Sequence, residues 1–113
     1  MTGKRITDNL DAMLRVLPPA ITSRLNEINQ SDELLEVIID LGRVPTARYV
    51  NGEQVLSQTE ITHLEIDYVV SRIGAFDTDN RAGMERTLHR ISAIRNRLGK
   101  IVGLTCRVGR AVY

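Results

Sequence analysis

The chain has 113 residues, of which 42% are hydrophobic and 26% charged, and its formal net charge is +1. This composition is typical of one globular domain, so we expect a single domain over residues 1–113. The single cysteine, Cys106, excludes an internal disulfide, and the short apolar runs predict neither a signal peptide nor membrane insertion. We therefore expect a cytoplasmic protein.

Charge is distributed unevenly along the chain. Residues 81–110 hold eight of the fifteen Lys and Arg residues and one acid, whereas the first eighty residues hold seven bases and thirteen acids. Such asymmetry within one domain indicates a surface that binds an anion. Nucleotide phosphate, nucleic acid and an acidic neighbouring protein all fit the charge alone.

Two amphipathic helices are predicted at the start of the chain. The first follows Thr7, a candidate N-cap, and its apolar stripe has helical spacing: Leu10, Met13, Leu14 and Leu17. Pro18 and Pro19 end this helix, because proline lacks a backbone N–H, and they can open a second. The apolar face of the second helix is Ile21, Leu25 and Ile28.

Residues 36–57 predict a meander of three short strands. Six of residues 34–41 are aliphatic, Gly42 follows, and Asn51-Gly52 is a strong hairpin signal. The preceding residues 31–36, SDELLE, fit either a short helical turn or the lead into a strand.

A central helix is predicted to begin at a capping box formed by Thr62 and Glu65 and to end near Gly74. Its buried residues are predicted to be Leu64, Tyr68, Val69 and Ile73. The polar loop at residues 75–80, AFDTDN, then leads into the basic third of the chain.

The basic third fits a helix or a hairpin. Its first half has helical spacing at Met84, Leu88, Ile91 and Leu98, but residues 101–108 alternate like a strand, and Gly99 suits a hairpin loop. The apolar face of that strand is Val102, Leu104, Cys106 and Val108. The pattern favours the hairpin.

Two hairpin registers are possible. A three-residue loop at residues 97–99 places Leu88 and Ile94 on the apolar face. A two-residue loop places Ile91 and Ala93 there instead and sets Arg90 across from Arg107.

The run DNRAGMERTLHRISAIRNRLGKIVGLTCRVGRAV resembles the N-terminal domain of a cyanobacterial and plastid ATPase family. In that family a P-loop AAA-type domain follows, and often a single-stranded nucleic-acid-binding Arg-x-x-x-His domain. ITDNLDAMLRVLPPAI and LLEVIIDLGRVPTARY match the family's opening, so the resemblance covers residues 6–112. More distantly, the chain is similar to the stage III sporulation protein AA family and to the N-terminal domain of pilus-retraction and secretion ATPases.

The resemblance implies a regulatory and assembly domain that packs over a nucleotide cleft. Its implied partner is the ATPase core of the same or a neighbouring subunit in a hexamer, and ATP with Mg²⁺ is implied for the full-length family. This chain has no G-x-x-x-x-G-K-[ST] motif, so we expect it to hold no cofactor and to catalyse no reaction by itself.

The resemblance also implies phosphate-contacting arginines. Arg90 and Arg107 match motif positions, Arg86 and Arg110 lie nearby, and a planar guanidinium can bind phosphate oxygens in a bidentate manner. These arginines could instead solvate an exposed sheet face or pair with the acidic part of the chain. A secondary basic patch comprises Arg81, Arg95, Arg97 and Lys100.

The alternative function is a nucleic-acid-binding module that acts through phosphate contacts. Residues 81–110 contain no aromatic side chain other than His89 for base stacking, so such binding would be electrostatic and salt-dependent.

No metal or catalytic constellation is predicted. His63 and His89 have no ligand-spaced partners, Cys106 is expected to be a buried apolar residue, and Asp77 and Asp79 lack the rest of a calcium loop and predict a turn.

The predicted elements together indicate an α+β fold. Two N-terminal helices and one central helix pack on a mostly antiparallel sheet, made of a three-strand meander and a C-terminal hairpin.

Overall fold

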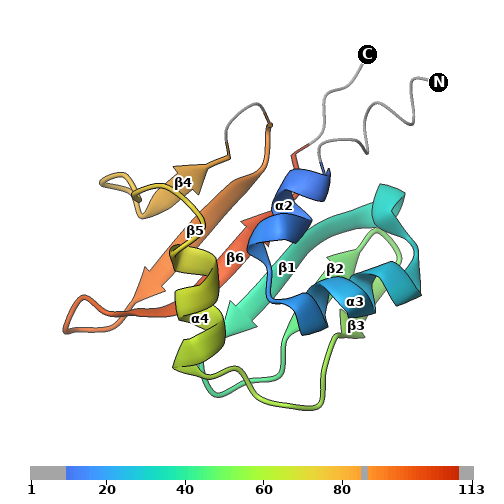
Figure 1. Cartoon of the computed structure of the whole chain (residues 1–113), viewed down its shortest axis with the longest axis horizontal. Helices are drawn as coiled ribbons and strands as arrows, with labels where there is room; N and C mark the ends of the chain where they lie inside the picture. The colour runs from blue at the N-terminus through green and yellow to red at the C-terminus, as the bar shows by residue number, and fades with distance from the viewer. Residues whose placement is uncertain (1–9, 85–86, 110–113) are drawn as a thin grey trace.

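The computed structural model describes residues 10–84 and 87–109 (Figure 1). Its elements in chain order are α2 (Leu10–Val16), α3 (Pro19–Ile28), the 3-10 helix η1 (Ser31–Glu33), β1 (Leu34–Asp40), β2 (Thr46–Tyr49), β3 (Gly52–Val55), α4 (His63–Val70), β4 (Arg81–Gly83), β5 (Arg90–Arg95) and β6 (Ile101–Arg107).

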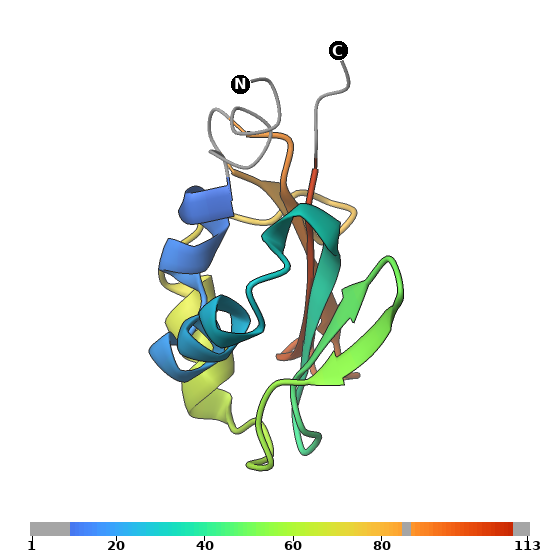
Figure 2. The ribbon, with the colours of Figure 1, turned by 90° about the vertical axis from the view of Figure 1, so that its right-hand side faces the viewer.

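All six strands form one antiparallel sheet in the order β3-β2-β1-β6-β5-β4. The helices α2, α3 and α4 lie together on one side of this sheet, and no helix of the described residues covers the other side (Figure 2). The predicted α+β fold is confirmed. β1 pairs with both β2 and β6, so it joins the predicted meander to the predicted hairpin.

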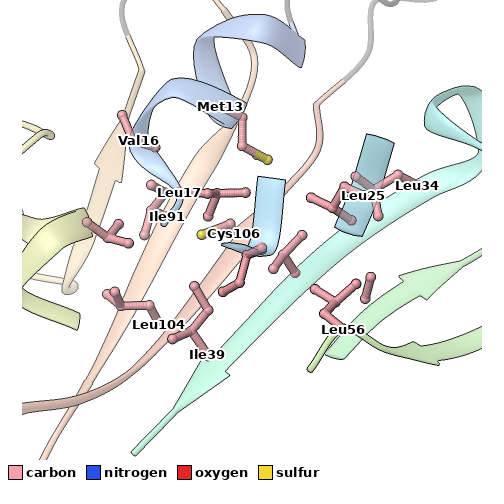
Figure 3. Packing of buried hydrophobic residues seen from close by; sticks show 14 of the residues in the cluster. Met13, Val16, Leu17, Leu25, Leu34, Ile39, Leu56, Ile91, Leu104 and Cys106 are labelled. Atoms are coloured by element: carbon pink, nitrogen blue, oxygen red, sulfur yellow. The ribbon is translucent and has the colours of Figure 1, made fainter. Parts of the chain in front are cut away.

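The hydrophobic core lies between the helices and the face of the sheet that they cover. Alternation along the strands supplies this face, because successive side chains of a strand point to opposite sides. Met13 and Leu25 from the helices, and Leu17 from the link between them, pack toward Ile39 and Leu104 from the sheet (Figure 3).

The two N-terminal helices meet at the proline pair, as predicted. α2 ends at Val16, Pro18 is the N-cap of α3, and Pro19 is its first residue. Most of the predicted apolar residues are buried: Leu10, Met13, Leu17, Ile21 and Leu25. Leu14 and Ile28 are partly buried, and the candidate cap Thr7 lies outside the described residues.

The predicted capping box of α4 is confirmed. The Thr62 hydroxyl accepts a hydrogen bond from the Leu64 N–H at 3.2 Å, and the Glu65 carboxylate accepts one from the Thr62 N–H at 2.6 Å. The predicted burial of Leu64 is wrong, since 77% of that residue is exposed. Val69 is buried as predicted, and Ile66 is buried in place of Leu64, because a residue two positions before Ile66 points about 200° away from it around the helix.

α4 is also shorter than predicted. It ends at Val70, so Ile73 lies beyond it and is only partly buried. Residues 31–33, for which a helical turn and a strand lead were both considered, form η1, and the strand follows directly at Leu34.

The basic third forms a hairpin, and its register combines the two possibilities. At the tip, the Asn96 N–H donates to the Lys100 carbonyl at 2.9 Å, which leaves residues 97–99 as a three-residue loop. A bulge between Ile94 and Arg95 then shifts the pairing by one residue. Beyond it Ile91 is buried, whereas Leu88 and Ile94, predicted on the apolar face by the three-residue loop, are 59% and 53% exposed.

β4 is a strand that sequence reasoning missed. Its three residues are too few to show alternation, and they pair with β5 at the edge of the sheet. The turn that precedes β4 is the one predicted for the acidic loop. The Asp77 carboxylate accepts hydrogen bonds from the N–H groups of Asp79 and Arg81.

Candidate anion-binding site

The side of the sheet that faces away from the helices is called the open face here. Among the strand residues that form it, because they alternate with the buried ones, are Glu36, Ile38, Asp40, Thr46, Arg48, Arg81, Arg90, Ser92, Ile94, Thr105 and Arg107. The open face thus displays side chains from β1, β2, β4, β5 and β6.

Arg90 and Arg107 are direct cross-strand partners on the open face. Both are exposed, and directly opposed residues have Cβ atoms about 5 Å apart, a distance at which like charges repel. Within the described residues, neither arginine forms an ion pair. We call these two residues the arginine pair.

A second pair of charges on the same face behaves differently. Arg48 and Glu36 are also cross-strand partners, and the Arg48 Nε atom lies 3.1 Å from the Glu36 carboxylate. Glu36 also lies opposite Arg107 of β6, the strand on the other side of β1, but it forms its ion pair with Arg48. Glu36 and Arg48 therefore compensate each other, whereas Arg90 and Arg107 form no ion pair among the described residues.

A third arginine, Arg81, extends this positive region onto β4. It lies opposite Ser92, and Gly83 of the same strand lies opposite Arg90. The nearby Asp77 carboxylate bonds the backbone N–H of Arg81. The open face thus carries arginines on three consecutive strands, β4, β5 and β6.

A shallow pocket of about 210 Å³ lies beside the arginine pair. Its lining adds Leu88, Val108 and Gly109 to the two arginines. A Cβ atom at position 109 would collide with the Leu88 backbone, so only glycine lets the chain after β6 lie against the start of β5. The pocket therefore combines two cations with the exposed side chain of Leu88.

His89 fixes this region from the covered side. Its side chain is buried, with 3% of the residue exposed, and its Nδ1 atom accepts a hydrogen bond from the Gly109 N–H at 3.0 Å. This bond connects the residues that flank the arginine pair on β5 and β6. Because His89 precedes Arg90 directly, its packing sets the position from which the Arg90 side chain projects.

The side chains of this site can bind an anion through electrostatic attraction. Guanidinium groups bind carboxylate or phosphate oxygens through charge-assisted hydrogen bonds, but they do not act as nucleophiles or bases. Cys106 lies on the covered face, as predicted, and burial raises the pKa of its thiol to about 12, so it carries no thiolate at neutral pH. Among the described residues no cluster of His, Cys, Asp or Glu could hold a metal ion.

The other basic residues that the sequence analysis selected lie in different places. Arg86 and Arg110 lie outside the described residues. The secondary patch is split, because Arg81 lies on the open face while Arg95, Arg97 and Lys100 lie at the β5–β6 tip. Arg95 has a structural role there, since its guanidinium donates to the Asn80 side chain at 2.7 Å and to the Gly99 carbonyl at 2.8 Å.

Three relatives of known sequence resemble most of this chain. It is 51% identical over 106 residues to the SEEDLING PLASTID DEVELOPMENT 1 protein of Arabidopsis thaliana. That match covers 94% of this chain and 16% of the Arabidopsis protein. It is 49% identical over 108 residues to the uncharacterized protein ycf45 of Porphyra purpurea. That match covers 96% of this chain and 19% of the Porphyra protein. The ycf45 protein of Cyanidium caldarium is 39% identical over 105 residues, 93% of this chain and 31% of its own length.

This chain therefore spans less than a third of the length of each of these relatives. No family model matches the chain, and no solved structure matches it. In residues 10–84 and 87–109, no helix has the length and apolar character needed to cross a membrane.

The comparisons correct the expected identity. The relatives are named for plastid development or as uncharacterized proteins, and no name describes an ATPase, a secretion protein or any other enzyme. The predicted ATPase N-terminal domain is therefore wrong, and the alternative of a nucleic-acid-binding module has no support in these names either. Only the plastid part of the expected family agrees with them.

The expected cofactors and partners stay untested predictions. These are ATP with Mg²⁺, an ATPase core in a hexamer, and nucleic acid. The first two have lost the family resemblance that motivated them, and nucleic acid rests on the charge pattern alone.

Proposed function

We propose that this chain is a protein-interaction domain and that its arginine pair binds an acidic segment of a partner protein. One observation carries the proposal. Arg90 and Arg107 stand opposite each other and neither forms an ion pair among the described residues, whereas Arg48 on the same face is paired with Glu36, which also lies opposite Arg107. Directly opposed like charges destabilise a sheet, and an acidic ligand would remove that repulsion.

The surroundings of the pair favour a protein ligand over a small free anion. Both guanidinium groups are solvent-exposed and the pocket beside them is shallow, so a single small ion would stay hydrated and weakly held. Leu88, which is 59% exposed beside the pair, adds apolar contact area that a peptide can use. A segment with carboxylates next to an aliphatic residue fits both features.

We further propose that this interaction takes place in plastids. Support comes from the Arabidopsis relative, whose name refers to plastid development and whose matched part is 51% identical to this chain.

The test is a titration of ¹⁵N-labelled protein with an acetylated Glu-Glu-Leu-Glu-Glu peptide, followed by amide chemical shifts. We expect the shifts to concentrate at Leu88, Arg90 and Arg107, and Arg107→Glu to weaken binding by about 10-fold or more. Arg97→Glu is the matched control, because it changes the net charge equally at the hairpin tip. Equal weakening by both variants would show that only net charge matters and would overturn the proposal.

A parallel titration with inorganic phosphate separates the two ligand classes. We expect phosphate to shift the same amides only at much higher concentration. If phosphate saturates the site as readily as the peptide does, the site binds small anions and the proposed protein ligand is wrong.

A further inference from the structure

An apolar groove of about 440 Å³ lies on the helical side of the molecule, between the start of α3 and the start of α4. Its apolar lining consists of Pro18, Pro19, Ala20, Ile21, Pro45, Ile61, Leu64 and Tyr68. Glu60 and Glu65 also line it, and neither forms an ion pair within the described residues, although the Glu65 carboxylate accepts hydrogen bonds from Thr62. We call this feature the proline groove.

The walls of the proline groove are held in place before any ligand arrives. The capping box fixes the start of α4, and the Ile61 N–H and carbonyl bond the loop that follows β1, at Arg43 and Gly42. Tyr68 is covered by Arg72, whose guanidinium carbon lies 3.4 Å from the ring centre. A preformed groove loses little conformational entropy on binding.

The β5–β6 hairpin presents a side chain that matches this groove. Leu98, at the tip, is 93% exposed, and the tip extends beyond the rest of the sheet (Figure 1). The flanking cations Arg97 and Lys100 are exposed and form no ion pair within the described residues. Turn tips usually carry polar residues, so a fully exposed leucine there needs an explanation.

Hydrogen bonds also define the backbone of the tip. The Asn96 side-chain oxygen accepts hydrogen bonds from the N–H groups of Leu98 and Lys100, at 2.9 and 3.0 Å. Gly99 adopts a left-handed conformation with φ of 84°, which closes the loop. The backbone that carries Leu98 between Arg97 and Lys100 is therefore held by local hydrogen bonds.

We infer that the β5–β6 tip of one copy of this chain docks into the proline groove of a second copy. Leu98 would enter the apolar groove, and Arg97 and Lys100 would approach the carboxylates of Glu60 and Glu65. The two most exposed large apolar side chains of the described residues, Leu98 and Leu64, would then cover each other.

A second copy is the occupant because the chain carries both halves of the match. The groove belongs to the acidic part of the sequence and the tip to the basic third, so the charges are complementary. The contact is small, which predicts weak, concentration-dependent association. It uses different residues from the arginine pair and does not rest on the proposed function.

The test is sedimentation velocity and ¹⁵N chemical shifts, measured on the chain over a wide range of protein concentration. We expect association to increase with concentration and to shift the amides of Leu64, Tyr68 and Leu98. Leu98→Asp and Leu64→Asp should each weaken association by about 10-fold or more. Both positions are exposed, so thermal melts are expected to show folded variants. The matched control Leu88→Asp alters another exposed leucine and should leave association unchanged.

Two further variants make the test specific for this pairing. Glu60→Lys should weaken association, and adding Lys100→Glu to the same chain should restore it. A mixture of the Leu98→Asp and Leu64→Asp chains should associate more strongly than either chain alone, because each supplies the half that the other lacks.

Three results would overturn the inference. The first is a monomer at every concentration, and the second is association that neither leucine variant weakens. The third is that the charge swap does not restore association and the mixture associates no more strongly than either variant alone. Reversing Arg90 and Arg107 should leave self-association intact, so the failure of this inference and of the proposed function can be told apart.

Discussion

The two faces of the sheet share one backbone but have opposite properties, and β6 carries both. Leu104 and Cys106 point to the helices and are fully buried, while Thr105 and Arg107 alternate with them on the open face. The covered face stabilises the fold by burying aliphatic groups. The open face holds charges that add nothing to the core, and two of them repel each other across β5 and β6.

This difference indicates where binding is to be sought. Like charges that stand directly opposite each other and form no ion pair in the described chain point to an external ligand rather than to packing. The arginine pair meets that description, whereas Arg48 does not, because it is paired with Glu36. The contrast between the faces can be tested by substituting adjacent residues on one strand.

The largest effect is expected at Leu104. Truncation by Leu104→Ala leaves a cavity in the core and should lower the free energy of unfolding by about 2–5 kcal/mol, as measured by urea denaturation. Its neighbour Thr105 faces the other way, and Thr105→Ala should change that free energy by at most about 0.5 kcal/mol. Similar losses at both positions would mean that the open face is packed as tightly as the covered one.

How much of this arrangement could be predicted depends on how local its cause is. The break at Pro18 and Pro19 and the cap at Thr62 follow from interactions within a few residues, and both were predicted correctly. The register of the β5–β6 hairpin depends on a bulge, and no residue pattern in the sequence predicts that bulge. That bulge decides whether Ile91 or Leu88 is buried.

The candidate site was predicted in composition but not in geometry. The family resemblance pointed to Arg90 and Arg107, and their direct opposition, one of the two registers left open, depends on the same bulge. The addition of Arg81 depends on β4, a strand too short to recognise. The proline groove was missed because Leu64 was assigned to the core, and the tertiary rotation of α4 could not be read from helical spacing alone.

A smaller effect is expected at the capping box, which holds one of the covering helices. Thr62→Ala removes the side-chain acceptor of α4 and should cost about 1 kcal/mol at neutral pH. Bonding by the Thr62 backbone N–H holds the pKa of Glu65 below its usual value. That contribution to stability is therefore present above about pH 4.5 and is lost as pH falls through the lowered pKa.

Comparing wild type with Glu65→Gln by thermal unfolding at several pH values measures this contribution. The wild type should be more stable at neutral pH, and the difference should shrink in acid below about pH 4.5. A difference that stays constant with pH would mean that ionisation of Glu65 does not support the cap.

The smallest effect is expected at the arginine pair, and its sign is the informative part. Arg107→Gln removes a like-charge contact and should raise the free energy of unfolding by a few tenths of a kcal/mol in low salt. Arg48→Gln on the same face removes an attractive contact and should lower it by about as much. Salt screens exposed charges, so both changes should fade at high ionic strength. If Arg107→Gln destabilised the chain instead, the arginine would have an intramolecular partner, and the open face would lose its uncompensated charge as the basis for binding.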